Sequence, residues 1–338
     1  MPTPAGPGRR LRLAAASAAL SVLCAVAGAE AYLRARHHTY HPDNLRPSPL
    51  AVDGHADAAC YAAHPLLGWA PRPGTCGREA HGTVQTPALQ GAPPAGVPRV
   101  VVLGDSIADQ RVWVAEATAA AARARGAPLV TYNAGVPGYD TCSEVTLLEQ
   151  RLLALRPDRV LLQFCLNDFE VSAAVLPAGD GWVRVHGPRP VELPAAVLRS
   201  RLALDLSLRF GWGRPAAIAH RPQLAVAPCL DHLAALSAAH GFDVRVVLFP
   251  ALTDTPAEGR VEIAGRPTPW DAAEAEAAAL FAARGFPVLD LRGPLAARGP
   301  LVSQRDQPLD VWHPDAATQR ALGPLVGPFL ADGLAARP

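Results

Sequence analysis

A serine, a histidine and an aspartate occur in two short motifs whose residue types suit nucleophilic catalysis. Ser106 follows the apolar run "VVLG" within "GDSI", and Asp310 and His313 lie three residues apart in "DVWHP". A serine hydroxyl becomes a strong nucleophile when a neighbouring imidazole takes its proton. A carboxylate close to that imidazole can orient the ring and stabilise its charged form. These residues predict a catalytic triad of Ser106, His313 and Asp310.

Charge that develops on a carbonyl oxygen during such an attack needs hydrogen-bond donors, and three stretches of the chain supply them. The donors are the backbone amide of Ser106, a glycine amide of "NAGVPG" at 133–138, and the side-chain amide of Asn167 in "LND". Backbone N–H groups and asparagine amides are typical of oxyanion holes. The neighbouring acids Asp105 and Asp168 are predicted to support the site by bracing these loops as hydrogen-bond acceptors.

Short apolar runs alternate with alanine-rich stretches after about residue 98. Five runs have the length and β-branched content of strands: 99–104, 129–135, 159–165, 243–249 and 286–291. Four stretches have a helical pattern: 113–126, 143–155, 230–241 and 271–285. This alternation predicts an α/β fold, a three-layer α/β/α sandwich around a central parallel sheet of about five strands. The polar motifs follow strands, so we expect them to meet at one edge of the sheet.

In this order the four motifs resemble those of the SGNH hydrolase superfamily, also called GDSL esterases or lipases, from about residue 99 to residue 323. The resemblance implies a flavodoxin-like SGNH fold and these roles: nucleophile and first oxyanion donor Ser106, second donor Gly138, third donor Asn167, base His313 and orienting acid Asp310. Gly138 is preferred over Gly135 because it lies five residues after Asn133, as in the family. One position departs from the pattern: Cys165 stands where the asparagine motif often has glycine.

The N-terminus predicts export from the cytoplasm. Arginines precede an uncharged apolar stretch at 13–29, which as a helix of about 1.5 Å per residue would extend about 25 Å. We interpret residues 1–36 as a membrane anchor that leaves the catalytic domain outside the cytoplasm, on the periplasmic or extracellular side. The alternative is a signal peptide cleaved after Ala29, which gives a secreted protein. The segment is also similar to the anchors of bacterial members of this superfamily.

The remaining chain is predicted to form a linker and one catalytic domain. Residues 37–97 are rich in Pro, Gly and Ala and indicate an extended approach segment with a short strand near "LLGWA". Residues 98–335 form the catalytic domain, with an insertion at about 169–228 that contains a hairpin pattern and an amphipathic helical pattern. Cys60 and Cys76 could close a loop in an oxidising compartment, but the sequence leaves their pairing open.

Several classes of partner are not indicated. The formal charge is +1 and no run of basic residues with aromatics occurs beyond the first dozen positions, so nucleic acid is not an expected partner. No Cys-x-x-Cys pair or helical histidine pair suggests a metal, and no cofactor is expected. The oligomeric state stays open.

We therefore expect an extracytoplasmic serine esterase that acts on a small-molecule or glycan ester through an acyl-serine intermediate. An O-acyl group on a carbohydrate or cell-envelope molecule is the substrate class that location and resemblance suggest. Two alternatives remain: an acyltransferase that passes the acyl group to a glycan hydroxyl, and a non-catalytic envelope or glycan-binding protein that keeps the fold.

Overall fold

The computed structural model describes residues 7–35, 46–47, 60–64, 67–87, 94–169, 174–179, 181–186, 191–215, 226–252, 258–264, 266–296 and 312–335. The chain forms two compact units. The first unit comprises Met1–Gly54 and Ala173–Ile218, and the second comprises His55–Ser172 and Ala219–Pro338.

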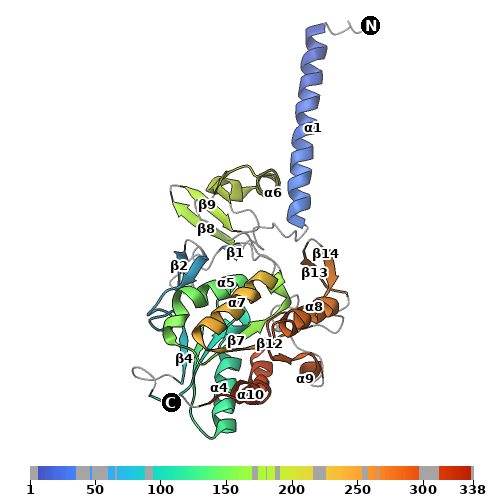
Figure 1. Cartoon of the computed structure of the whole chain (residues 1–338). Helices are drawn as coiled ribbons and strands as arrows, with labels where there is room; N and C mark the ends of the chain where they lie inside the picture. Colours follow the sequence, from blue (N-terminus) through green and yellow to red (C-terminus); the bar gives the residue numbers. More distant parts are fainter. Residues whose placement is uncertain are drawn as a thin grey trace. The chain divides into compact units, whose positions relative to one another are not determined.

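A six-stranded sheet forms the centre of the second unit (Figure 1). Its order is β15 (Val288–Asp290), β12 (Asp243–Leu248), β7 (Arg159–Phe164), β5 (Arg99–Leu103), β6 (Val130–Asn133) and β4 (Val84–Thr86). The first five are the strands predicted from the apolar runs, and all their pairings are parallel. The prediction missed β4, which pairs antiparallel with β6 at the edge.

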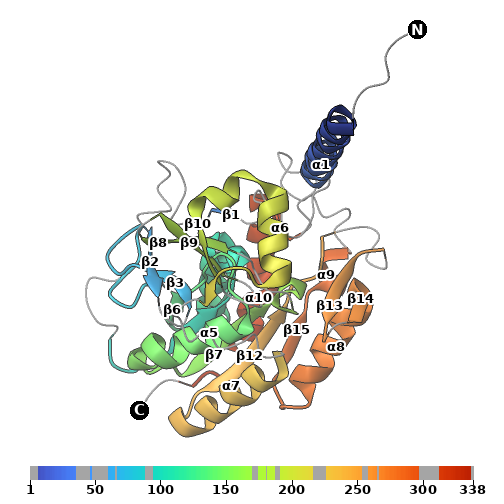
Figure 2. The same cartoon turned by 90° about the horizontal axis from the view of Figure 1, so that it is seen from above.

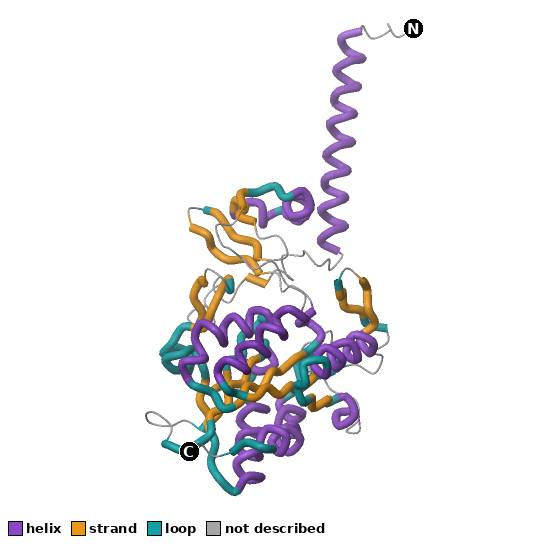
Figure 3. The backbone as a smooth tube through the Cα atoms, in the orientation of Figure 1, coloured by secondary structure: helices purple, strands orange, loops and turns teal. Residues whose placement is uncertain are grey.

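Helices cover both faces of this sheet, as the layers in Figure 3 show. Helices α5 (Thr141–Leu147) and α7 (Val226–His240) lie on one face, and α4 (Val112–Arg125) and α10 (Ala316–Ala331) lie on the other (Figure 1). Trp113 and Leu322 belong to the buried core between α4, α10 and the sheet. The remaining elements of this unit are α3 (Ser106–Asp109), η1 (Leu148–Leu152), η2 (Leu153–Leu155), η3 (Leu166–Phe169), β13 (Arg260–Ile263), β14 (Arg266–Pro269), α8 (Trp270–Ala282) and α9 (Arg292–Ala296).

The approach segment is more ordered than the sequence predicted. A hairpin of β2 (Tyr61–His64) and β3 (Gly68–Pro71) precedes β4, so the short strand expected near "LLGWA" is present. Cys60 and Cys76 form a disulfide that closes this segment. Residues 60–87, which the sequence assigned to the approach segment before residue 98, belong to the second unit and contribute strand β4 to its sheet. A second disulfide, Cys142–Cys229, joins α5 to α7.

The first unit combines the N-terminal helix with residues of the predicted insertion. Its sheet has the order β1 (Arg46–Pro47), β8 (Ala174–Gly179), β9 (Trp182–His186), β10 (Val191–Pro194) and β11 (Arg214–Pro215). Turn η4 (Ala195–Arg199) and helix α6 (Arg201–Phe210) follow β10, so the hairpin and the helix expected in this region are both present. Helix α1 (Pro7–Ala35) contains Leu13–Arg34, which is long and apolar enough to cross a membrane.

Candidate active site

Ser106 lies where the chain leaves the central strand β5 and enters α3. Its Oγ is 2.7 Å from Nε2 of His313, which comes from the segment just before α10. Both residues are half-buried. The structure thus brings together two predicted site residues that are 207 positions apart in the sequence. A hydroxyl at this distance from an imidazole can transfer its proton directly.

Asp105 fixes the start of α3. One carboxylate oxygen accepts a hydrogen bond of 2.8 Å from the Ile107 N–H, which caps the helix, and the other accepts one of 2.7 Å from the side-chain amide of Asn167. The Asp105 N–H in turn donates to the Gln163 side chain on β7. Asp105 is fully buried. Asp105 therefore connects the loop after β5 with the loop after β7 and holds the two loops together.

Asn167 keeps one amide hydrogen that Asp105 does not use. Its Nδ2 donates to Asp105, while its Oδ1 accepts a hydrogen bond from the Cys165 thiol. The Cys165 sulfur also lies 3.4 Å from the second oxygen of Asp105. Cys165, the departure from the family pattern, is therefore buried beneath the asparagine loop. Burial, followed by the charge of Asp105, raises the pKa of the Cys165 thiol well above its usual range, which keeps the thiol protonated as a donor.

Asp168 braces the same loop from below. Its carboxylate accepts hydrogen bonds from the Thr141 hydroxyl at 3.0 Å and from the Cys165 N–H at 2.9 Å. Close by on α5, Glu144 is buried and neither of its carboxyl oxygens has a hydrogen-bond partner. Burial raises the pKa of Glu144 well above its usual range, and the charge of Asp168 raises it further. Glu144 was not singled out from the sequence.

The glycine loop after β6 contains two glycines with different surroundings. The Gly135 N–H donates to Asn133 Oδ1, and a Cβ at Gly135 would lie 2.5 Å from the Asp109 nitrogen of α3. Gly135 thus allows close packing against α3, and its N–H is already hydrogen-bonded to Asn133. Gly138 adopts φ 76° in the turn after Pro137 and is half-buried. This turn follows β6, the parallel neighbour of β5, at the same edge as Ser106.

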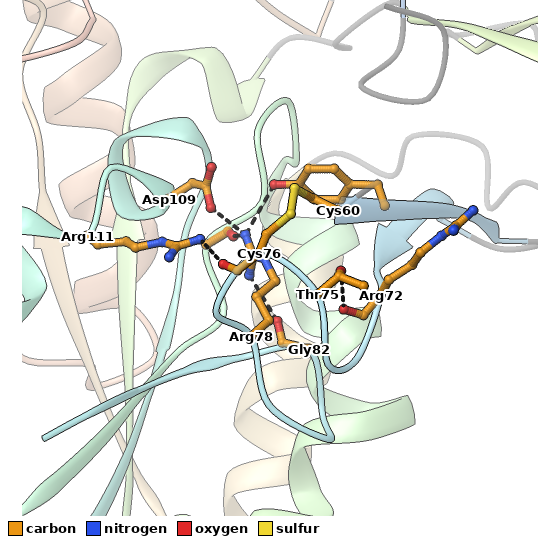
Figure 4. Close-up of a disulfide and its surroundings, with 10 residues drawn as sticks. Cys60, Arg72, Thr75, Cys76, Arg78, Gly82, Asp109 and Arg111 are labelled. Carbon is orange, nitrogen blue, oxygen red and sulfur yellow. Dashed lines mark hydrogen bonds and ion pairs between the residues drawn. A yellow bond between two sulfur atoms is a disulfide. The ribbon is translucent and has the colours of Figure 1, made fainter. Parts of the chain in front are cut away.

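Arg78, in the approach segment, contacts Gly82 and Asp109 (Figure 4) and also reaches the glycine loop. Its guanidinium donates to the carbonyl oxygens of Gly82 and Gly135, to the Tyr61 hydroxyl, and to the Asp109 carboxylate at the end of α3. Arg78 is only 4% exposed. No pattern near Arg78 in the sequence indicates this role, because its partners lie up to 57 residues away.

The loop that carries His313 is held by α10. Gln319 is buried and its Nε2 donates to the Pro314 carbonyl at 3.0 Å, and also to the side chain of Gln110 at the end of α3. Asp315 accepts a hydrogen bond from the Thr318 N–H and caps the start of α10. Asp310, the predicted orienting acid, lies outside the described residues.

An aromatic cluster adjoins His313. The ring of Trp312 contacts that of Trp270 edge to face, with centroids 5.2 Å apart, and both pack with Phe169 against the β13–β14 hairpin. Within the described ranges, no group of three His, Cys, Asp or Glu side chains is arranged to hold a metal ion. The groups that the described part of the site offers for chemistry include the Ser106 hydroxyl, the His313 imidazole and the amide of Asn167.

Ser106, the glycine loop and Asn167 follow the carboxyl ends of parallel strands, which is where α/β folds place their binding and catalytic sites. The model of the GDSL-like lipase/acylhydrolase family matches residues 102–321, more than half of the chain, and the protein belongs to this family of hydrolases acting on esters. The resemblance to SGNH hydrolases is thereby confirmed.

Solved structures with a similar fold share little sequence. A lipase/acylhydrolase from Enterococcus faecalis is 17% identical, with 72% of this chain and 100% of that chain covered and a TM-score of 0.43. An acetylxylan esterase from Geobacillus stearothermophilus is 12% identical, with 70% and 94% covered and a TM-score of 0.42. A search of curated proteins found no match.

Proposed function

We propose that this protein hydrolyses an ester through a covalent acyl-serine intermediate. The observation that carries the proposal is the 2.7 Å distance between Ser106 Oγ and His313 Nε2. A nucleophile and a base within hydrogen-bond reach are the signature of covalent catalysis by serine. Membership of a family that acts on esters supports the same reaction.

The reaction proceeds in two halves. Ser106 Oγ attacks the carbonyl carbon of the ester while its proton passes to His313 Nε2. The bond to the alcohol oxygen then breaks, His313 returns the proton to that oxygen, and the alcohol leaves an acyl-serine. Water attacks the acyl carbon with His313 again as base, so that the carboxylic acid is released and the serine hydroxyl is restored.

Three donors are assigned to the oxyanion: the Ser106 N–H, the Gly138 N–H and the amide hydrogen of Asn167 that Asp105 does not bind. Loss of one such donor typically costs about 3 kcal/mol of transition-state stabilisation. Asp310 is assigned to orient His313, and Gln319 supports it by holding the Pro314 carbonyl. Replacement of Asp310 by Asn is expected to lower kcat strongly and leave the binding of substrate nearly unchanged.

We assign the enzyme to the outside of the cytoplasm, with α1 retained as an anchor and an O-acylated carbohydrate or envelope molecule as substrate. Two disulfides are typical of proteins in an oxidising compartment. Mass spectrometry of the mature protein decides between the anchor and cleavage after Ala29.

The full chain, purified in detergent, is assayed with nitrophenyl esters from acetate to octanoate. Ser106→Ala is expected to abolish turnover, whereas the control Ser143→Ala, on α5, retains it. A fluorophosphonate probe should add its mass to Ser106 alone. A folded wild type that neither turns over any ester nor reacts with the probe contradicts the proposal.

The same preparation separates hydrolysis from acyl transfer. An oligosaccharide acceptor is added, and the products are analysed by mass spectrometry. Free acid as the main product in the presence of acceptor supports hydrolysis. An acylated acceptor formed only with intact Ser106 makes the protein an acyltransferase.

A further inference from the structure

Large hydrophobic side chains that are exposed occur at two places in the part of the chain that the structure describes. One is α1, with Leu13, Leu20, Val22, Leu23, Val26 and Tyr32. The other is the end of α6, where Phe210 is 64% exposed and Trp212 is 59% exposed. Both places belong to the first unit. Exposed apolar side chains gathered in this way mark a contact surface rather than scattered surface residues.

The two aromatic rings at the end of α6 are held in a defined arrangement. Gly211 ends the helix in a left-handed conformation, and the Trp212 N–H donates to the Ser207 carbonyl at 2.8 Å. The rings of Phe210 and Trp212 stack with centroids 5.2 Å apart and an interplanar angle of 25°. Leu204, by contrast, is buried against β9 and β10. Helix α6 therefore has apolar residues on two sides. The side with Leu204 is buried against the sheet, and the side with Phe210 is exposed.

Glu30 of α1 binds the beginning of α6. Its carboxylate accepts hydrogen bonds from the N–H groups of Arg201 and Leu202 and from the Ser200 hydroxyl, at 2.9 to 3.1 Å. Arg34 on the last turn of α1 donates to the Arg199 carbonyl at 3.1 Å. These contacts place the first turn of α6 beside the end of the uncharged stretch of α1.

Helix α6 runs across the direction of α1. It is seen end-on beside α1 in Figure 1 and lengthwise in Figure 2. Its ten residues extend about 15 Å at about 1.5 Å each. Because α6 runs sideways, Phe210 and Trp212 stay close to the level at which the apolar part of α1 ends. Aromatic residues are enriched at this level of a membrane, where the headgroups meet the acyl chains.

We propose that α6 is an interfacial membrane helix whose Phe210–Trp212 pair inserts into the lipid surface next to the α1 anchor. The inference rests on the proposed anchoring of α1. Its consequence is that the first unit lies on the bilayer and is fixed to it at two points, the spanning helix and the aromatic pair. A glycan that stacks on the same rings is the competing occupant, and the contacts between Glu30 and α6 favour the lipid.

The test uses the full chain in vesicles of phosphatidylcholine and phosphatidylglycerol, with or without bromine atoms on the acyl chains. Helix α1 contains no tryptophan, so quenching by brominated lipid reports on tryptophans elsewhere. We expect tryptophan emission to fall in the brominated vesicles, and Trp212→Phe to abolish this loss. The matched control Trp182→Phe, in the same unit, should retain it. Circular dichroism verifies that both variants are folded.

Flotation of the vesicles separates the two proposals. If the full chain does not float with lipid, the anchor and the interfacial helix are both contradicted. If it floats but Trp212→Phe leaves the quenching unchanged, or no quenching occurs, the interfacial helix alone is overturned. If Trp212 emission responds to an added oligosaccharide and not to brominated lipid, the aromatic pair binds a glycan. This outcome also overturns the proposal of an interfacial helix.

Discussion

The guanidinium of Arg78 donates a hydrogen bond of 3.0 Å to the carbonyl of Gly135, 57 residues later in the chain. The same side chain also contacts Asp109, at the end of the helix that begins with Ser106. One buried cation therefore joins the approach segment closed by a disulfide, the glycine loop and helix α3. The two backbone amides proposed as oxyanion donors, those of Ser106 and Gly138, belong to elements that Arg78 holds in place.

Replacement of Arg78 by Gln is expected to destabilise the protein by about 3 kcal/mol, because it leaves a carboxylate and carbonyl groups without their cation. A shift of the glycine loop by about 1 Å would lower kcat by up to about a hundredfold. Urea unfolding and ester kinetics measure the two effects. The exposed Arg72, in the same segment, gives the control Arg72→Gln. Equal behaviour of the two variants would contradict this role.

Gly135→Ala is expected to lower activity, because the new methyl group would lie 2.5 Å from the Asp109 nitrogen and 2.7 Å from the Ala108 carbonyl carbon. Overpacking of this kind costs about 1 to 3 kcal/mol and would displace α3. Gly293→Ala has open space around its Cβ and is the control. Kinetics with a nitrophenyl ester should show the loss in the first variant alone.

Glu144→Gln is expected to change how stability depends on pH. The pKa of Glu144 is raised in the folded protein, so the protonated form stabilises the fold below the ordinary value of 4.5, and this contribution is lost as pH rises through the folded pKa. Glutamine cannot lose a proton. Between the pKa of unfolded Glu144 and its raised pKa in the folded protein, the free energy of unfolding should therefore shift in favour of the variant by about 1.4 kcal/mol per pH unit.

Urea unfolding at several pH values measures this difference in the free energy of unfolding. The exposed Glu258 provides the control Glu258→Gln, whose difference from the wild type should stay constant with pH. A constant difference for Glu144→Gln as well would show that Glu144 is ionised in the fold.

Cys165 should resist alkylation in the native protein. Burial raises the pKa of its thiol. At a fixed pH, each unit by which a thiol pKa rises lowers the fraction of reactive thiolate about tenfold. Iodoacetamide at pH 8 should modify the Cys165 peptide after unfolding and leave it unmodified before, as read by mass spectrometry. Rapid modification of the native protein would mean that the thiol is open to solvent.

Local patterns predicted the parts of the fold that depend on local sequence. The five parallel strands are buried and rich in β-branched residues, so each run in the sequence corresponds to an observed strand. Strand β4 has three residues and no distinct pattern, because its place in the sheet comes from pairing with β6. The β13–β14 hairpin was also missed, because each strand has only four residues and two of those in β14 are prolines, which argue against a strand.

The residues of the candidate site also fall into those that local motifs predicted and those that they did not. Ser106, His313 and Asn167 were found from short motifs, since the chemistry requires particular residue types beside particular strands. Arg78 and Gln319 were missed because they act through main-chain carbonyls that any residue carries. Such positioning contacts have no signature in the sequence near them.

The hydrogen bond between Glu30 and Ser200 also has a consequence for the order of assembly during translation. The two residues are 170 positions apart. At about 5 to 20 residues per second, the ribosome needs roughly ten to thirty seconds to synthesise the intervening chain. Glu30 therefore lacks its hydrogen-bond partners on α6 while the segments with Ser106, Gly138 and Asn167 are synthesised. Helix α1 thus completes its contacts with α6 only after strands β5, β6 and β7 of the central sheet have been synthesised, and before the segment with His313.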